Sequence, residues 1–513
     1  MAISDGLVVA TGALAELRRA FPSSSVQDFD DATIVPGFND AHCHLTMAVD
    51  NASSLDLSDP SIGTLDDALE QIRVAAASAV PGQWVRAVRY DDGRTWGSEP
   101  LSRRVLDSVA PDTPVVVTHV SCHWGVANST ALRVSGIDEA TPEPDGGTYG
   151  RDSGGSLNGI LYERAFFDFA LPSIGDADSS AHVRSTEERL SGMSKVLSEW
   201  HAAGLTSICD AAVAPADVEM FQRAVDQGLL TMRSSMLLVA DHYTGPAALR
   251  LPDAYEPTLL RFAGVKLFLD GAIGGRTCMN SRPHRDGSFG IQTTGTDVLR
   301  EVIERLHRDG ARACVHANGD VAIDMVLTIM EEVEARTPRA GPPHRIEHGS
   351  QVSPDLVQRI AALGVIVVPF SNYARYHGGN LLDWYSKEQV DWLFAHRSLL
   401  DAGVALGASS DYPCSPVEPL AAMQSLVTRV GQDGVPVGTK QRIEPHEALA
   451  LLTTGSATAC GEEQYKGRLA PGFLADFVVL GDDPRRHDPL GIASIPVLAT
   501  VVGGVPVWSG YEG

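Results

Sequence analysis

The sequence lacks the features that attach a chain to a membrane or mark it for export. No apolar run approaches the ~18–20 residues that a membrane span needs. The first residues, from Met1 to Gly6, carry neither a basic segment nor a sustained apolar stretch, so no secretory signal peptide is visible. We therefore expect a cytoplasmic protein without a membrane partner.

Paired cysteines and an excess of positive charge are also missing. The seven cysteines are odd in number and never in a C-x-x-C pattern, which excludes a cysteine zinc finger and gives no sign of a disulfide framework. The formal net charge of the 513 residues is −25, and the acidic residues are dispersed rather than in blocks. Such a chain is not expected to bind nucleic acid or an anionic membrane surface.

The second part of the chain, from Arg184 onwards, has a repeating pattern of helix, Gly and strand. Amphipathic helical patterns end in Gly, and a β-rich apolar run begins at once. A Gly just past a helix end is the usual left-handed C-cap, and repeated helix–Gly–strand units imply parallel strands with crossover helices. With an opening strand near the start of the chain, eight strands are expected, at residues 34–45, 205–210, 229–238, 263–270, 311–316, 345–349, 365–370 and 404–411.

These eight strands predict an α/β fold. Eight parallel strands with alternating helices close most simply into a (β/α)8 TIM barrel, which would occupy residues 34–461. A doubly wound open sheet is the alternative. It is disfavoured because no G-x-G-x-x-G turn follows the first strand.

Two accessory parts are expected beside the barrel. Residues 1–33 and 462–513 contain short β-like pieces, and we expect both chain ends to form one small β-sandwich domain. The pieces are at 7–10, 25–29, 475–480 and 497–508, the last of them a hairpin around Gly503 and Gly504. An inserted subdomain is expected after the first barrel strand, at about residues 52–182, with strands at 84–90 and 114–120 and turns throughout 141–155.

A His-x-His motif, His42 and His44, ends the first expected barrel strand. Residues two apart in a strand point to the same face, so both imidazoles would project one way and Cys43 the other. Two imidazoles on one face can bind a divalent metal. Ordinary buried histidines would give the same pattern, because a lone His-x-His is a weak motif.

Further candidate ligands stand at other strand ends, where barrel enzymes carry their catalytic groups: Lys266, His316, His348 and Asp411. Imidazole and carboxylate donors without a thiolate suit Zn²⁺, Fe²⁺, Mn²⁺ or Ni²⁺. Lys266 as an ammonium would repel a cation, so it fits only if it is neutral or if CO₂ converts it to a carbamate. The alternative for Lys266 is a structural ion pair with Asp270.

Asp411 has a second expected role, as catalytic base. A metal lowers the pKa of bound water from 15.7 toward ~7, so a nearby carboxylate can complete its deprotonation. The alternative is that Asp411 is the N-cap of a following helix. That alternative is weaker because Tyr412 and Pro413 follow immediately.

These residues, in this order, resemble the amidohydrolase superfamily, and within it the YtcJ-like branch that includes N-substituted formamide deformylases. The matching stretches span nearly the whole chain: 36–45, 123–132, 265–271, 316–320, 345–349, 409–413 and 467–480. Relatives usually carry a further strand ahead of Asp5 and Gly6, and here that strand is expected to be missing.

The resemblance implies a ligand set for one or two divalent metals, with zinc as the expected ion. His42, His44 and Asp411 would bind one ion, and His316 with His348 the second. Lys266 would be an N6-carboxylysine that bridges them.

The resemblance also implies a substrate site in the insert. There His123, with Trp124 beside it, would close over the substrate, and His123 would polarise a carbonyl oxygen. The alternative is a structural loop histidine.

The expected function is that of a metal-dependent amidohydrolase. It would cleave a non-peptide C–N bond in a small molecule, an N-substituted amide or formamide, through a metal-activated hydroxide, and Asp411 would return its proton to the leaving amine. Ester or lactone hydrolysis by the same site is an alternative, because metal hydroxide does not distinguish the two carbonyls.

Two other functions are disfavoured. Superfamily deaminases resemble one another in a His-x-x-Glu after the fifth strand, whereas Gly319 stands in the Glu position after His316. A non-enzymatic assembly role conflicts with the presence of all six candidate ligands. The resemblance is compatible with a homodimer.

Overall fold

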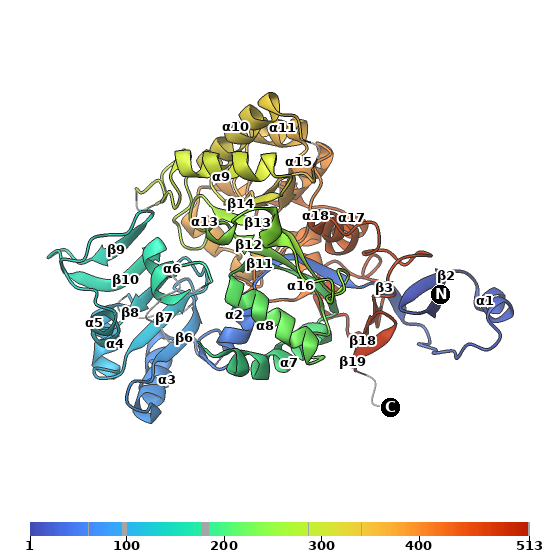
Figure 1. Ribbon diagram of the computed structural model, residues 1–513. Coiled ribbons are helices and arrows are strands. Elements are labelled where there is room, and N and C mark those ends of the chain that lie inside the picture. Colours follow the sequence, from blue (N-terminus) through green and yellow to red (C-terminus); the bar gives the residue numbers. More distant parts are fainter. Residues whose placement is uncertain are drawn as a thin grey trace.

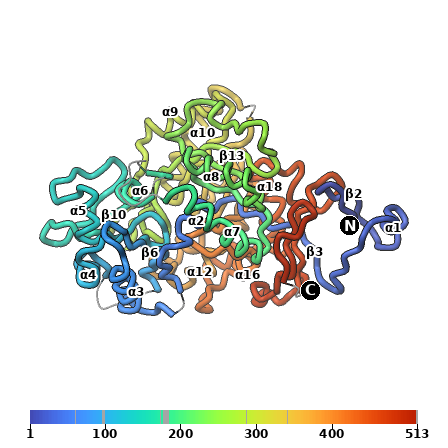
Figure 2. The backbone as a smooth tube through the Cα atoms, turned by 60° about the horizontal axis from the view of Figure 1, so that its bottom comes forward, coloured from blue at the N-terminus to red at the C-terminus, as the bar shows by residue number. Residues whose placement is uncertain are grey.

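The computed structural model describes residues 1–59, 61–94, 100–171, 173–175, 184–285, 287–339 and 341–510. A barrel stands at the centre, the insert lies on one side of it, and the chain ends lie on the other (Figure 1). Figure 2 shows the same three-part arrangement from a second direction. No helix in the described ranges is both long and apolar enough to cross a membrane.

Seven barrel strands are regular and parallel, in the order β16-β15-β14-β13-β12-β11-β4. They are β4 (Phe38–Cys43), β11 (Leu205–Val213), β12 (Arg233–Val239), β13 (Leu260–Phe268), β14 (Ala313–Ala317), β15 (Arg345–His348) and β16 (Ile366–Val368). Each lies within or overlaps one of the predicted strands. Buried aliphatic and cysteine side chains pack against these strands, and the buried pair of Arg345 and Glu347 lies among them.

Residues 404–411 close the barrel between β16 and β4. The Gly407 N–H donates to the Val367 carbonyl at 3.1 Å, and the Ala41 N–H donates to the Ala408 carbonyl at 2.9 Å. These bonds reach both neighbouring strands, although residues 404–411 form isolated bridges rather than a continuous strand. The predicted (β/α)8 barrel is confirmed.

Helices around the barrel begin at capping residues and end before glycines with positive φ. The Ser185 and Glu188 side chains cap the start of α7 (Thr186–Ala202) reciprocally, which satisfies N–H groups that have no partner inside a helix. All five glycines predicted to follow helices have positive φ, between 66° and 92°: Gly204, Gly228, Gly310, Gly364 and Gly403. Each therefore adopts a backbone conformation that other residues rarely take.

The longer covering helices include α8 (Pro215–Asp226), α9 (Thr296–Arg308), α10 (Asp320–Arg336), α11 (Pro354–Leu363) and α16 (Pro419–Thr428), and α2 (Leu45–Asn51) and α18 (Ser456–Cys460) are short. Shorter helices α12 (Tyr373–His377), α13 (Asn380–Trp384), α14 (Lys387–Val390) and α15 (His396–Asp401) follow β16, and α17 (Pro445–Ala450) precedes α18.

The insert is a mixed six-stranded sheet in the order β5-β6-β7-β8-β10-β9. Its elements are β5 (Leu55–Asp56), α3 (Leu65–Ser78), β6 (Val85–Tyr90), α4 (Arg103–Val109), β7 (Val115–His119), β8 (Trp124–Ala127), α5 (Ser129–Val134), β9 (Gly147–Arg151), β10 (Leu157–Glu163) and α6 (Arg164–Ala170). Both predicted strands are present. The prediction of turns throughout 141–155 was wrong, because β9 pairs with β10 there.

The two chain ends meet in one small sheet, as predicted. β3 (Thr33–Pro36) pairs antiparallel with β17 (Phe477–Leu480), which pairs with β18 (Val497–Val502) and then β19 (Val505–Ser509). The predicted strand 34–45 is thus two strands, divided at Gly37. A Cβ at Gly37 would lie 2.1 Å from Thr206 Oγ1, so only Gly allows the chain to pass from this sheet into the barrel.

The extreme N-terminal segment differs from the prediction. β1 (Ala2–Ser4) and β2 (Leu7–Ala10) form a hairpin, so the strand expected to be missing ahead of Asp5 is present. Helix α1 (Leu14–Ala20) was not expected, and residues 25–29 form no strand. The domain limits at 33/34 and 461/462 stay predictions.

Closure of the barrel can be tested at Gly407. A Cβ there would lie 2.9 Å from the Cβ of Ala459 and 3.1 Å from that of Ala41, and neither rigid neighbour can yield. We expect Gly407→Ala to lower the free energy of unfolding by about 1–3 kcal/mol, measured by urea denaturation. Gly63→Ala is the control, since nothing lies within 4 Å of its added Cβ. Equal stability of both variants would contradict the close packing at residue 407.

Candidate active site

Three side chains from distant parts of the chain converge at the mouth of the barrel. His42 is the penultimate residue of β4, His348 is the last residue of β15, and Asp411 is the last residue of the closing segment 404–411. His42 Nε2 lies 3.2 Å from Asp411 Oδ1, and the His42 and His348 ring centroids are 4.6 Å apart. One donor atom from each of the three lies within 4.8 Å of the others. This spacing allows one metal ion to contact all three.

The remaining predicted ligands line the same cavity. His44 Nε2 lies 3.3 Å from Asp411 Oδ1, so both histidines of the His-x-His motif reach one carboxylate oxygen. The His316 ring centroid is 4.7 Å from that of His348. Lys266 lies on the cavity wall with them. All six predicted ligands are therefore brought together and are nearly or fully buried.

Glu347 orients the ring of His42. Its carboxylate forms a very short hydrogen bond with His42 Nδ1, and Arg345 donates to both Glu347 oxygens, at 2.8 and 2.7 Å. Since Nδ1 is occupied, Nε2 is the nitrogen of His42 that faces Asp411. This buried Nε2 has no well-aligned hydrogen bond among the described residues.

The backbone turns sharply at two of the converging residues. His348 has φ = 70° and Asp411 has φ = 50°, a left-handed conformation that costs a non-Gly residue about 1–3 kcal/mol. In a regular strand Glu347 and His348 would point to opposite faces. The turn at His348 ends that alternation, so both side chains lie beside His42. Such strain concentrates at functional sites.

Burial sets the charge state of the cavity. It holds the pKa of His316 and His348 well below the ordinary value, and it lowers the pKa of His44 to about 4. Burial alone would raise the pKa of Asp411, but His348 and the close approach of the His42 and His44 imidazoles hold that pKa well below its usual range. Neutral imidazoles beside an ionised carboxylate are the forms in which these groups bind metals.

Lys266 does not pair with Asp270. The Asp270 carboxylate instead accepts backbone N–H groups of Met279, Asn318 and Gly319 at 2.8–2.9 Å. The Lys266 side chain is 1 % exposed, and burial lowers the pKa of its amine. Among the described residues it makes no ion pair, which leaves the amine directed at the cavity.

Asp411 does not cap a helix. The next helix is α16, and it begins only at Pro419. The Asp411 carboxylate faces His42 and His44 instead. The N-cap alternative is therefore excluded.

The two residues predicted for substrate binding have different positions. His123 lines the cavity, with its ring centroid 4.9 Å from that of His316, and its Nδ1 lies 2.6 Å from Glu163 Oε2. Trp124 does not line the cavity: its indole stacks on His119 at 4.2 Å inside the core of the insert. The position of Trp124 does not support the predicted contact with substrate.

Several residues of the site were not predicted. Glu347 and Glu163 fix the rings of His42 and His123, and Asp210 Oδ1 lies 3.9 Å from His44 Nδ1. Metal-binding histidines usually donate their second N–H to such a carboxylate. The sequence did offer a signal for Glu347, because Arg345 and Glu347 are two apart in one strand and therefore share a face.

The donor set fits a divalent metal. It combines neutral imidazole nitrogens and a carboxylate without a thiolate, which suits zinc and its neighbours in the first transition row. The buried Nε2 of His42 and Nδ1 of His348 have no hydrogen bond among the described residues, and burying polar atoms in this state is costly unless another group binds them.

Comparison with known proteins assigns the family. Residues 25–508 match the amidohydrolase family. The chain belongs to this family. The amidohydrolase shares 32 % identity over 511 residues with an N-substituted formamide deformylase of Arthrobacter pascens, covering 98 % of this chain and 93 % of the relative. It shares 27 % identity over 518 residues with YtcJ of Bacillus subtilis (strain 168), covering 99 % and 95 %. The predicted resemblance is confirmed.

A solved structure supports the fold of this amidohydrolase. A metal-dependent hydrolase from Pyrococcus horikoshii superposes with a TM-score of 0.74 at 23 % identity, covering 95 % of this chain and 94 % of that one. At this identity the likeness shows the fold. The family assignment confirms the predicted enzyme class, a hydrolase that acts on carbon–nitrogen bonds other than peptide bonds.

The contribution of the buried pair of Arg345 and Glu347 to the stability of the barrel can be tested by unfolding. Glu347→Gln leaves the fully buried Arg345 without its counter-ion, and removing one partner of a buried pair costs about 3–5 kcal/mol. We expect a corresponding loss of stability in urea. Glu70→Gln is the control, because the pair of Glu70 with Arg73 is exposed to solvent and should contribute little. Equal small losses in both variants would show that the buried pair does not support the barrel.

Proposed function

We propose that the amidohydrolase cleaves the C–N bond of a small N-substituted amide, in the first place a formamide. The observation that carries this proposal is the convergence of four histidines, a lysine and an aspartate at one barrel mouth. The relative of 32 % identity named N-substituted formamide deformylase supports the formamide as substrate.

The proposed metal ligands fall into two groups. His42, His44 and Asp411 would hold one zinc ion, because all three meet at Asp411 Oδ1. His316 and His348 would hold a second, and Lys266, as a carbamate formed with CO₂, would bridge the two. When bound, such ions act as Lewis acids and lower the pKa of a coordinated water toward ~7.

The protein residues would move the protons and position the carbonyl. The ionised Asp411 carboxylate takes a proton from the attacking water and later gives it to the leaving nitrogen. His123 is tied to Glu163 through Nδ1, which leaves Nε2 as the ring nitrogen available to the carbonyl oxygen of the substrate. Because the cavity is buried, these charges act with little screening by solvent.

Deamination of a heterocycle is disfavoured by the geometry as well as by the sequence. A Cβ at Gly319 would lie 1.9 Å from the Met279 carbonyl oxygen, so the backbone leaves no room for the acidic side chain of deaminases. Ester or lactone hydrolysis stays open, because the same groups act on either carbonyl.

The role of Asp411 is tested by Asp411→Asn. The amide cannot accept the proton, so we expect kcat for an N-alkylformamide to fall by about 10²–10⁴-fold. Metal content, measured by elemental analysis, should remain at the level of the unaltered protein, since the imidazoles still bind. Asp253→Asn makes the same chemical change on the exposed surface and should leave kcat unchanged. An unaltered rate in Asp411→Asn would refute the assignment.

A further inference from the structure

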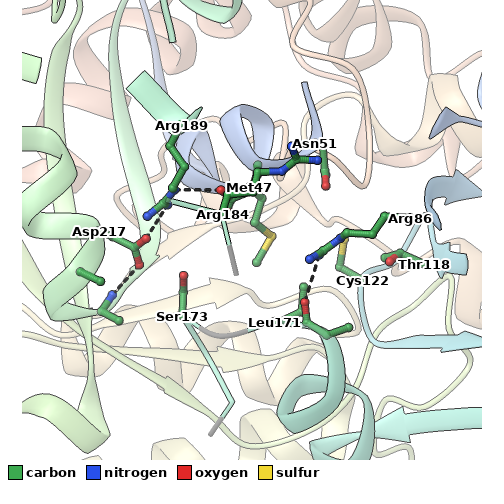
Figure 3. A pocket seen from close by; sticks show the side chains of 14 residues that line it. Met47, Asn51, Arg86, Thr118, Cys122, Leu171, Ser173, Arg184, Arg189 and Asp217 are labelled. Atoms are coloured by element: carbon green, nitrogen blue, oxygen red, sulfur yellow. Dashed lines mark hydrogen bonds and ion pairs between the residues drawn. The ribbon is translucent and has the colours of Figure 1, made fainter. Parts of the chain in front are cut away.

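The seven cysteines of the chain, which all lie in the described ranges, differ in access to solvent. Six of them are buried, and Cys122 alone is partly exposed. Cys122 lines the cavity of the proposed metal ligands and also a pocket that adjoins this cavity between the insert and the barrel (Figure 3). A dissolved reagent can therefore reach this thiol, whereas packing shields the other six.

A second thiol, that of Cys414, lies against the loop that carries Cys122. Cys414 Sγ donates to the Ser121 carbonyl at 3.4 Å, and this carbonyl belongs to the peptide group that joins Ser121 to Cys122. The side chains of Cys122 and Cys414 are hydrogen-bonding neighbours, and both line the cavity of the proposed metal ligands. Two thiols that are far apart in the sequence thus meet where the insert contacts the barrel.

Both segments are held in place by their own hydrogen bonds. In the loop between β7 and β8, the Cys122 N–H donates to the His119 carbonyl at 2.9 Å, and the Ser121 N–H donates to His119 Nδ1 at 3.1 Å. On the barrel side, the Cys414 N–H donates to the Asp411 carbonyl at 2.7 Å. The approach of the two thiols is therefore built into the fold. A disulfide requires such a fixed approach, because it tolerates only a narrow range of separations.

A second pair of neighbouring thiols shows that access decides which pair can react. Cys209 and Cys460 also form a hydrogen bond with each other, and this bond lowers the pKa of Cys460 to about 7. Ionisation alone would favour reaction at Cys460, but both side chains are at most 1 % exposed in the barrel interior. An oxidant in solution therefore reaches the pair at the cavity and not the pair inside the barrel.

We propose that Cys122 and Cys414 form a reversible disulfide when a hydroperoxide oxidises the protein. With hydrogen peroxide, the Cys122 sulfur takes one oxygen as the O–O bond breaks, which gives a sulfenic acid and one water. The Cys414 sulfur then displaces the sulfenic hydroxyl, which leaves with the Cys414 proton as a second water while the S–S bond forms. The two thiols together lose two electrons, and the peroxide gains them.

The disulfide ties together two segments that carry proposed catalytic groups. His123 follows Cys122 directly, and Asp411 is three residues before Cys414. The bond fixes the insert to the barrel at the wall of the cavity, where small displacements affect catalysis. We therefore expect oxidation to lower kcat/KM for an N-alkylformamide by about tenfold or more, and dithiothreitol to restore it. This consequence rests on the proposed function, whereas formation of the disulfide does not.

The first test counts free thiols. The intact protein is treated briefly with hydrogen peroxide and then denatured, and titration should find five free thiols, seven less the two of the bond. Dithiothreitol should restore all seven. Peptide mapping by mass spectrometry should show one cross-link, between the peptides of Cys122 and Cys414. Seven thiols after treatment, or oxidation without this cross-link, would overturn the inference.

The second test removes the thiols one at a time. Cys414→Ser leaves Cys122 without its partner, so the sulfenic acid should persist and be labelled by dimedone, a reagent that reacts with sulfenic acids. Cys122→Ser should keep all six of its remaining thiols. Cys209→Ala is the matched control, since it removes one thiol of the buried pair and should still form the cross-link. Equal labelling of Cys122 in the unaltered protein and in Cys414→Ser would contradict the role of Cys414 as its partner.

Rates measured on the same samples separate this inference from the proposed function. If the cross-link forms but the reduced protein hydrolyses no formamide, the formamide proposal fails and the disulfide stands. If the reduced protein hydrolyses the formamide and the cross-linked protein is equally fast, the inhibitory effect of the disulfide is refuted. Cys122→Ser should have the same rate before and after peroxide treatment. A loss of rate in this variant equal to that of the unaltered protein would show that oxidation acts elsewhere.

Discussion

The hydrogen-bond chain from Arg345 through Glu347 to His42 connects the barrel interior to the candidate active site. Arg345 also donates to the carbonyls of Ala41 and Ala459, at 3.0 and 3.1 Å, so one buried guanidinium binds β15, β4 and α18 together. A buried charge is tolerated only when it is paired and hydrogen-bonded. Here Glu347 pairs with Arg345 and also forms a hydrogen bond with His42. The position of the His42 imidazole, a proposed metal ligand, is thereby set by the same contacts that hold the strands in register.

Most of the barrel could be predicted because its local signals agree with its global topology. Gly at five helix ends has positive φ, which is the conformation that Gly alone adopts without cost, so each helix–Gly–strand junction marked a true strand. The ends of those strands then identified the candidate ligands, because the carboxyl ends of parallel strands meet at one face of a barrel. In the sequence, His42 lies far from both His348 and Asp411. The strand order nevertheless predicted that these three side chains would meet at one end of the barrel.

What the sequence could not predict depends on contacts between distant segments. The division of residues 34–45 at Gly37 follows from the close approach of Thr206, and no local pattern reveals that contact. The β-strand at Gly147–Arg151 forms in turn-like sequence because β10 supplies its partner. Trp124 was assigned to the substrate by proximity to His123, although neighbouring positions of a strand face opposite sides.

The central claim is that the six converging residues form a two-metal site in an amidohydrolase. It is tested most directly by elemental analysis of the metal content per chain, on protein purified without chelator and without added metal. We predict two equivalents of zinc per chain, lost together when either His42 or His348 is replaced by Ala. A single equivalent would contradict the bridging role of Lys266, and a chain that retains no metal and takes up none on titration would contradict the claim itself.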